Sequence, residues 1–238
     1  MHHVLITGGS RGIGAACVHA FCQRGDAVAF IYQKDHAAAE KIAKETGAFA
    51  VQADISDPES VSHALALVRA QLGEIDILIN CAGIGQIKLF TDLTNDDWRR
   101  MLGVNLDSAF YLCRAVAPGM IRGGWGRIVN VGSMWGKVGA SCEVHYSAAK
   151  AGLRGLTMAL AKELGPSGIT VNCVEPGVID TDMNAALSAE DRAALCDETP
   201  LCRIGRPEEV AAAVTFLASE SAAFITGQCL GVDGGFAV

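Results

Sequence analysis

The sequence predicts one α/β domain in which a seven-stranded parallel sheet carries helices on both faces, the doubly wound arrangement. Three observations lead to this prediction. The 238 residues suffice for one substantial core and barely for two. Short apolar runs alternate with longer amphipathic segments, as right-handed β-α-β crossovers require. Half of the residues are hydrophobic but only 6% are aromatic, which suits Val- and Ile-rich strands buried beneath Ala- and Leu-rich helices.

Seven apolar runs are the expected strands, and six amphipathic stretches are the expected helices. The strands are placed at His3–Thr7, Ala27–Tyr32, Ala48–Ala53, Ile75–Ile79, Arg127–Val131, Thr170–Val174 and Gln228–Val232. The helices are placed at residues 12–24, 36–46, 57–73, 95–122, 146–164 and 207–218. Residues 182–203 break the alternation: the segment is polar, helix-prone at Ala185–Cys196, and ends near Pro200. It is interpreted either as a lid over a substrate pocket or as a surface insertion of the single domain 1–238.

The charge and the apolar pattern exclude several classes of protein. A net charge of −7 argues against a nucleic-acid or membrane-surface binder, because phosphate groups need a basic face. No apolar run approaches the ~20 residues of a membrane span, and the N-terminus carries no basic-then-apolar leader. We therefore expect a cytoplasmic protein that binds neither nucleic acid nor membrane.

The nine cysteines are scattered along the chain without a C-x-x-C pair or an adjoining pair of histidines. Such an odd, dispersed set is typical of reduced thiols that serve as small core residues. We therefore expect no disulfide framework and no metal site from Cys17, Cys22, Cys81, Cys113, Cys142, Cys173, Cys196, Cys202 and Cys229.

A glycine-rich loop follows the first expected strand and leads into a helix. Glycines allow the backbone to approach a pyrophosphate, and the start of the next helix offers free N–H groups to an anion. The spacing G-x₃-G-x-G differs from the common G-x-G-x-x-G, and glycines also collect in turns without a ligand. The position of the loop after the first strand favours a dinucleotide site of the Rossmann type. The loop reads Thr7-Gly8-Gly9-Ser10-Arg11-Gly12-Ile13-Gly14.

The end of the second strand predicts which nicotinamide cofactor is bound. An acidic side chain there would bind the ribose 2′-hydroxyl and repel a 2′-phosphate. The chain instead reads Ile31-Tyr32-Gln33-Lys34, and the first carboxylate is Asp35. Lys34 and Arg11 of the glycine-rich loop could both pair with a phosphate. The sequence therefore predicts NADPH rather than NADH.

Tyr146 and Lys150 are the expected proton-transfer pair. Their separation of four places both side chains on one helix face. A Lys charge ~5 Å away at an effective dielectric constant of ~20 would stabilise the phenolate by about 3 kcal/mol, or roughly two pKa units. The alternative interpretation is that Tyr146 and Lys150 are merely two exposed residues on a helix surface. Ser133, after the fifth strand, and Asn105, an unfavourable residue inside an expected helix, favour a catalytic group.

These residues together resemble the short-chain dehydrogenase/reductase superfamily in its compact single-domain branch, and the likeness is collinear along the whole chain. The Arg11–Gly14 segment and the Ile225–Gln228 and Asp233–Gly235 segments resemble bacterial 3-oxoacyl-acyl-carrier-protein reductases. The residues that carry the superfamily motif are Gly8, Gly12, Gly14, Asn80, Ala82, Gly83, Asn105, Ser133, Tyr146, Lys150, Pro176 and Gly177.

The resemblance implies a role for each catalytic residue. Tyr146 would donate a proton to a ketone oxygen as hydride arrives from the nicotinamide, giving a secondary alcohol. Lys150 would hold the nicotinamide ribose and lower the pKa of Tyr146. Ser133 would bind the substrate oxygen, and Asn105 would anchor a water that connects Lys150 to solvent.

The resemblance also implies further cofactor contacts and an assembly. Asp54 and Ile55 would contact the adenine, Asn80, Ala82 and Gly83 would line the cofactor, and Pro176, Gly177, Ile179 and Thr181 would lie at the nicotinamide carboxamide. Compact members are typically homotetramers, and an exposed apolar edge near the C-terminus favours association.

The substrate is less closely defined by the sequence. Trp135 lies beside Ser133 and suits packing on a substrate chain. Glu143 and Glu175 would favour a cationic substrate if both face the site, although either could point to solvent or cap a helix. The stretch from Ser133 to Ser147 resembles the reductases of the 5-aminopentanone modification on elongation factor P. A 3-oxoacyl thioester or an aminoketone, small or carried on a protein, is thus the expected substrate; an inactive nicotinamide-binding regulator is a further alternative.

Overall fold

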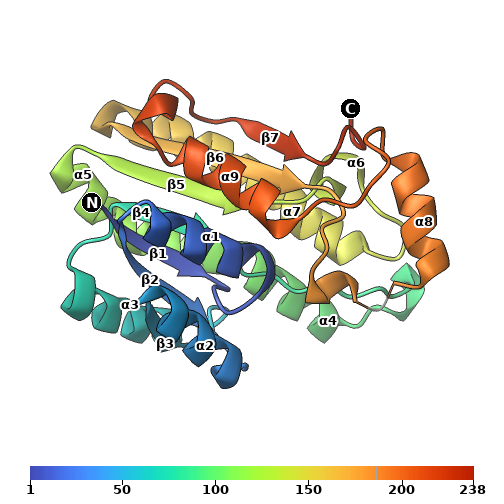
Figure 1. The fold of residues 1–238 in the computed structure, drawn as a ribbon, viewed down its shortest axis with the longest axis horizontal. Coiled ribbons are helices and arrows are strands. Elements are labelled where there is room, and N and C mark those ends of the chain that lie inside the picture. The colour runs from blue at the N-terminus through green and yellow to red at the C-terminus, as the bar shows by residue number, and fades with distance from the viewer. Residues whose placement is uncertain (186) are drawn as a thin grey trace.

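Seven parallel strands form one sheet in the order β3-β2-β1-β4-β5-β6-β7 (Figure 1) in the computed structural model, which describes residues 1–185 and 187–238. The predicted class and strand number are confirmed. The strand order reverses between β1 and β4, and in such sheets ligands bind beyond the carboxyl ends of the strands at this point. The strands are β1 His3–Thr7, β2 Ala27–Tyr32, β3 Phe49–Gln52, β4 Ile77–Asn80, β5 Gly126–Val131, β6 Ile169–Pro176 and β7 Cys229–Val232.

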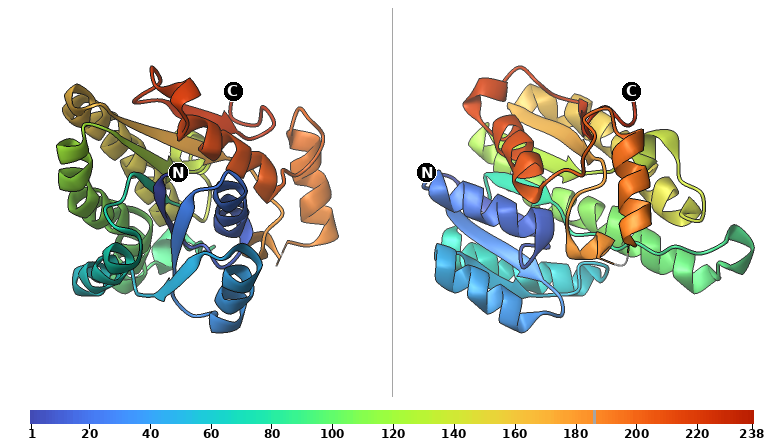
Figure 2. Two further views of the ribbon diagram at one scale, coloured as in Figure 1. Left: turned by 60° about the vertical axis from the view of Figure 1, so that its left-hand side comes forward. Right: turned by 45° about the vertical axis from the view of Figure 1, so that its right-hand side comes forward.

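Helices cover both faces of the sheet (Figure 2). One face carries α1 Gly12–Gln23, α2 His36–Thr46 and α9 Pro207–Leu217, whose apolar side chains share a core with β1, β2 and β4. The other carries α3 Pro58–Leu72, α5 Ser108–Gly123 and α7 Val144–Leu164. Both faces of the central strands are therefore buried, as continuous apolar strands require, while the outermost strands β3 and β7 are partly exposed.

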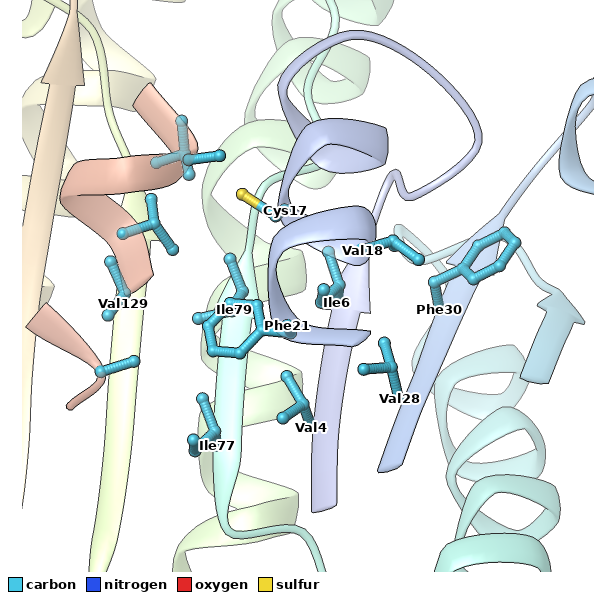
Figure 3. Packing of buried hydrophobic residues seen from close by; sticks show 14 of the residues in the cluster. Val4, Ile6, Cys17, Val18, Phe21, Val28, Phe30, Ile77, Ile79 and Val129 are labelled. Atoms are coloured by element: carbon cyan, nitrogen blue, oxygen red, sulfur yellow. The ribbon is translucent and has the colours of Figure 1, made fainter. Parts of the chain in front are cut away.

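The core beneath α1 fixes the position of the glycine-rich loop. Cys17 and Phe21 of α1 lie over Ile6 of β1 and Ile79 of β4 (Figure 3), and all four are fully buried. Burial of such side chains contributes about 1.5–3 kcal/mol each for the larger ones. Because α1 is anchored along its length, its first residue, Gly12, is held beside the carboxyl ends of the strands.

The expected helix 95–122 is not continuous. The chain forms α4 Asn95–Leu102, a five-residue π-helical segment Gly103–Asp107, and then α5. A π-helical turn is an insertion in the backbone ladder that is frequent at functional sites. Asn105 lies in this turn and its amide donates to the Met101 carbonyl at 3.1 Å. The amphipathic pattern continues through the turn, so the pattern could not reveal it.

The segment 182–203 contains a short 3-10 turn, Asp182–Asn184, and α8 Ala189–Glu198, which begins with a Ser188–Asp191 capping box. The predicted helix is thus present but starts four residues later than expected. Residue 186, inside the predicted lid, lies outside the described residues. Asp180 accepts from Arg192 of α8 at 3.0 Å, which ties α8 to the chain that follows β6. The lid role stays a prediction.

Several apolar side chains are exposed on α4, α5, α9 and β7, among them Trp98, Phe110, Phe216 and Leu230. They are compatible with the expected homotetramer, which stays a prediction. Along the described chain, no helix combines the length and the apolar character that crossing a membrane would take.

Candidate active site

The glycine-rich loop and the start of α1 form one wall of a cavity of about 310 Å³. Among the described residues, no side chain caps the N-terminus of α1, whose first turn also lacks acidic residues. The free N–H groups and the helix dipole therefore face the cavity as a ready anion site. This arrangement suits the pyrophosphate of a dinucleotide.

Two glycines of the loop cannot be replaced without displacing the backbone. Gly8 has a φ of +72°, and a Cβ there would lie 2.9 Å from the Cα of Ala82. A Cβ on Gly14 would lie only 2.1 Å from the carbonyl oxygen of Gly8. The loop is thus folded tightly against itself and against the end of β4. Thr7 supports this contact, since its hydroxyl accepts from the backbone N–H groups of Cys81 and Ala82 at 3.0 Å each.

Most of the predicted cofactor residues line this cavity. They are Gly8, Ser10, Arg11, Gly12, Ile13, Gly14, Lys34, Asp54, Ile55, Ala82, Gly83 and Thr181. The cavity has further lining residues that were not predicted from the sequence, which are Ile31, Tyr32, Gln33, Asp35, Ala53, Cys81, Ile84, Val104, Asp182 and Met183. Most of these residues are sequence neighbours of a predicted cofactor residue, so extending the prediction by one residue along the chain would have included them. Val104 adjoins the predicted Asn105 in the π-helical turn, and Met183, in the segment after β6, adjoins no predicted residue.

A second group of predicted cofactor residues does not line the cavity. Asn80 is buried, and its amide donates to Asn130 of β5 at 2.8 Å, so it links two strands beneath the site. Pro176 ends β6, and a Cβ on Gly177 would lie 2.8 Å from the Cα of Asp233. Ile179 is buried beside Gly205. Their roles as cofactor contacts stay predictions, and the structure gives each a packing role.

Two cationic side chains, Lys34 after β2 and Arg11 of the glycine-rich loop, line the cavity together with the carboxylates of Asp35, Asp54 and Asp182. Lys34 is exposed there, and Arg11 lies across the cavity at 4.0 Å from Asp182. Asp54 accepts from the Ser56 hydroxyl at 2.6 Å, and this hydrogen bond, helped by the charge of Lys34, lowers the pKa of Asp54. Asp54 is therefore an ionised acceptor on this wall.

Lys150 and Asn105 converge behind Gly83, which lines the cavity. A Cβ on Gly83 would lie 2.7 Å from Oδ1 of Asn105 and 3.5 Å from Nζ of Lys150. The amide of Asn105 donates to the Ile84 carbonyl at 3.0 Å, and Nζ of Lys150 donates to the Val131 carbonyl at 2.9 Å. Only a residue without a side chain fits at Gly83, which lies between the cavity and these two polar groups. Within the described chain, the lining of the cavity itself includes none of Asn105, Ser133, Tyr146 and Lys150.

Lys150 is a buried cation. Burial lowers its pKa from the ordinary lysine value, because a desolvated ammonium is less stable than a neutral amine. Its Nζ lies 5.7 Å from the ring centre of Tyr146, close to the separation expected from the sequence. The thiols of Cys81 and Cys173 act in the opposite direction and raise the Lys150 pKa.

The pKa of Tyr146 corrects the expectation that Lys150 lowers it by two units. Burial of the phenol raises its pKa to about 12, and the nearby Glu143 and Cys81 raise it as well. The hydrogen bond with the Ser133 hydroxyl lowers the pKa but does not offset burial. The ammonium of Lys150 is directed to the Val131 carbonyl rather than to the phenol. In this site Tyr146 is therefore a protonated acid.

Of the four expected substrate residues, Ser133 is described above, and the other three lie in different surroundings. Trp135 opens α6 Trp135–Val138, its backbone N–H donates to the Ser133 hydroxyl at 3.2 Å, and its ring packs edge-on against Phe236. Glu143 precedes α7, and partial burial raises its pKa. Its charge reaches Tyr146, as the raised phenol pKa indicates. Trp135 and Glu143 thus flank the Ser133–Tyr146 pair.

Glu175 does not fit the expected role. Its side chain is buried in β6, and both carboxylate oxygens accept from Arg154 of α7 at 2.5 Å. A carboxylate paired in this way has no free oxygen to attract a cationic substrate. The proximity to Pro176 in sequence suggested the site, but the alternation of side chains along a strand turns Glu175 toward α7.

The fold and this site define an oxidoreductase that acts on CH–OH groups with a nicotinamide cofactor. The family model described as enoyl-(acyl carrier protein) reductase matches residues 8–237. The chain belongs to the short-chain dehydrogenase/reductase family, as the sequence predicted.

Relatives and a solved structure agree with this assignment. The chain is 41% identical to a 3-oxoacyl-[acyl-carrier-protein] reductase of Salmonella typhimurium, with 97% of this chain and 95% of that protein covered. It is 43% identical to the Pseudomonas aeruginosa reductase of the same name, with the same coverage. It superposes on a double mutant of a Serratia marcescens short-chain dehydrogenase/reductase with a TM-score of 0.93, at 37% identity, covering 100% of this chain and 98% of that chain.

Proposed function

We propose that this protein is an NADPH-dependent reductase that converts a ketone to a secondary alcohol, with a 3-oxoacyl thioester on an acyl carrier protein as its substrate. One observation carries the proposal: the Tyr146 ring lies beside the buried ammonium of Lys150, which approaches the cavity of the glycine-rich loop behind Gly83. An acid and a cation thus lie together behind the Gly83 wall of the cavity, and the Ser133 hydroxyl acts on the pKa of the acid. The relatives named 3-oxoacyl-[acyl-carrier-protein] reductase support the choice of substrate.

Each residue has a distinct part in the proposed reaction. When bound, the reduced nicotinamide supplies the hydride. The Ser133 hydroxyl donates to the ketone oxygen and fixes its position, and Tyr146 donates its proton to the same oxygen as negative charge develops there. Lys150 holds the nicotinamide ribose, and the Ser133 hydroxyl, which lowers the pKa of Tyr146, stabilises the phenolate that remains. Asn105 positions the water through which the proton is replaced.

The preference for NADPH is tested at Lys34. We expect Lys34→Ala to raise KM for NADPH by roughly tenfold, about 1.4 kcal/mol, and to leave KM for NADH within about twofold, because only NADPH carries the 2′-phosphate. Lys41→Ala is the matched control, since Lys41 is an exposed lysine on α2 away from the cavity. Steady-state kinetics with both cofactors decide the matter, and equal changes for NADH and NADPH would contradict the assignment.

Glu143 favours a second candidate, the reduction of an aminoketone such as the 5-aminopentanone group on elongation factor P. Glu143 is half-buried and its charge reaches Tyr146. A half-buried carboxylate beside the acid would attract the ammonium of an aminoketone and would repel an anionic substrate. A 3-oxoacyl thioester offers this carboxylate no partner.

Glu143→Gln separates the two substrates. If the aminoketone is the substrate, we expect kcat/KM for an aminoketone to fall by at least tenfold, with activity on an acetoacetyl thioester retained. If the thioester is the substrate, its kcat/KM stays level or rises and the aminoketone is not reduced. Glu163→Gln, an exposed acid near the other end of α7, is the matched control. NADPH consumption measured with both ketones gives the result, and failure with every ketone would refute the proposed reductase.

A further inference from the structure

Two cysteines face each other on the last two strands of the sheet. Cys173 of β6 and Cys229 of β7 are register partners, and the Cys173 N–H donates to the Gln228 carbonyl at 2.8 Å. Their sulfur atoms lie within 4.8 Å of each other and of a Glu175 carboxylate oxygen. Neighbouring strands lie ~4.8 Å apart, which is inside the Cα separation of about 4.4–6.8 Å that disulfides span. Figure 1 shows β6 and β7 side by side.

The surroundings favour thiol chemistry over a metal ion. Arg154 binds both oxygens of Glu175, so this carboxylate is already neutralised. Only the two thiols then remain of the three potential ligands in the cluster, and a structural zinc site needs four. A pair of thiols with no third free ligand is instead suited to oxidation.

The two thiols are not equivalent. Cys173 is fully buried, and its contact with Cys229 together with burial raises its pKa well above the ordinary value. Cys229 is half-exposed, and its pKa is lowered by the hydrogen bond with Cys173 and by the charge of Arg154. Cys229 is therefore the thiol that ionises and that an oxidant reaches first, and Cys173 is held behind it.

The pair lies directly beneath the catalytic segment. A Cβ on Gly132 would lie 2.8 Å from the sulfur of Cys173, and the Gly132 N–H donates to the Val174 carbonyl at 2.7 Å. Gly132 immediately precedes Ser133. The thiol of Cys173 also acts on the pKa of Lys150. A displacement of the Cys173 sulfur would therefore displace Gly132, and with it the adjoining Ser133, whose hydroxyl acts on the pKa of Tyr146.

We propose that Cys173 and Cys229 are a redox-modification site that a hydroperoxide converts to a disulfide, and that this disulfide lowers the activity of the adjoining catalytic site. The Cys229 thiolate attacks the hydroperoxide and the O–O bond breaks, so that Cys229 carries a sulfenic acid. The leaving oxygen takes a proton and departs as an alcohol, or as water when the oxidant is hydrogen peroxide. The Cys173 thiol then attacks the Cys229 sulfur, forming the S–S bond and releasing water. The two thiols lose two electrons, and the peroxide is reduced.

The site itself is tested without any measurement of activity. Reduced protein is treated with hydrogen peroxide, free thiols are alkylated after denaturation, and the digest is analysed by mass spectrometry without reduction. We expect a peptide pair joined through Cys173 and Cys229, lighter by two hydrogens, which dithiothreitol separates. Cys196→Ser, which removes another half-exposed thiol, should leave the linkage intact, and Cys229→Ser should abolish it. Joining of Cys229 to any other thiol, or its oxidation without joining, would overturn the proposal.

The effect on activity rests on the proposed reductase function and is measured separately. We expect peroxide to lower NADPH-dependent ketone reduction several-fold in the wild type and in Cys196→Ser, with recovery after dithiothreitol, and to have no such effect in Cys229→Ser. A complete linkage with unchanged activity would refute the coupling to the catalytic site. If the enzyme reduces no ketone at all, the mass-spectrometric result still decides whether the disulfide forms, so the two failures are distinguishable.

Discussion

Tyr146→Phe is expected to lower kcat for ketone reduction by about 10³-fold while the Kd for NADPH stays within about twofold. Positioned general acids contribute about 10²–10⁴ in rate, and the substitution removes only the phenolic oxygen. The pKa of Tyr146, about 12 in this site, means that the phenol holds its proton at neutral pH and is ready to donate it. The ring, which packs beside Lys150, is kept, so the cofactor cavity retains its shape.

Two measurements and one control make this prediction specific. Steady-state turnover gives kcat, and the fluorescence of bound NADPH gives Kd. Tyr111→Phe removes a phenol from a half-buried tyrosine of α5 outside the cavity lining and should leave both values unchanged. A Tyr146→Phe enzyme that keeps more than a tenth of wild-type kcat would mean that another group protonates the ketone.

The sequence predicted the sheet well because each strand is an isolated apolar run. The ranges His3–Thr7 and Ala27–Tyr32 agree with the structure at both ends, and the other five differ by one or two residues at an end. A strand buried on both faces is mostly apolar, so its limits are largely visible in composition, although β4, β5 and β6 also bury Asn80, Asn130 and Glu175. The glycine-rich loop was equally easy to recognise in the sequence. The close contact of Gly14 with Gly8 excludes any larger residue, so the fold requires the glycines that form the motif.

The parts that the sequence did not reveal depend on contacts between distant segments. The π-helical turn at Asn105 leaves no trace in the apolar pattern, although the unfavourable Asn inside a helix was a useful signal. The pKa of Tyr146 could not be derived from its spacing to Lys150, because burial and the Val131 carbonyl, which takes the ammonium's hydrogen bond, come from other elements. Glu175 was misplaced for the same reason, since its partner Arg154 lies on α7.

Gly14→Ala is expected to abolish measurable NADPH binding and to lower the free energy of unfolding by about 1–3 kcal/mol, as overpacking of a tight contact does. The added methyl carbon would lie 2.1 Å from the Gly8 carbonyl oxygen and 3.2 Å from the Cα of Gly9. Neither neighbour is a side chain that can rotate away. The loop must therefore move off α1, and the N–H groups at the start of that helix lose their position at the pyrophosphate.

The substitution affects NADPH affinity more than the free energy of unfolding, because the affinity depends on the loop and the stability depends mainly on the core. Denaturant unfolding measures the stability of the whole domain, most of which comes from the buried clusters on both faces of the sheet. NADPH binding, followed by fluorescence, depends on the loop in one conformation, so the shift of about 1 Å that relieves the 2.1 Å contact costs far more affinity than stability. Gly123→Ala is the control, because a Cβ at Gly123 meets no atom of the described chain within 4 Å. Full NADPH affinity in Gly14→Ala would show that the cofactor does not bind at this loop.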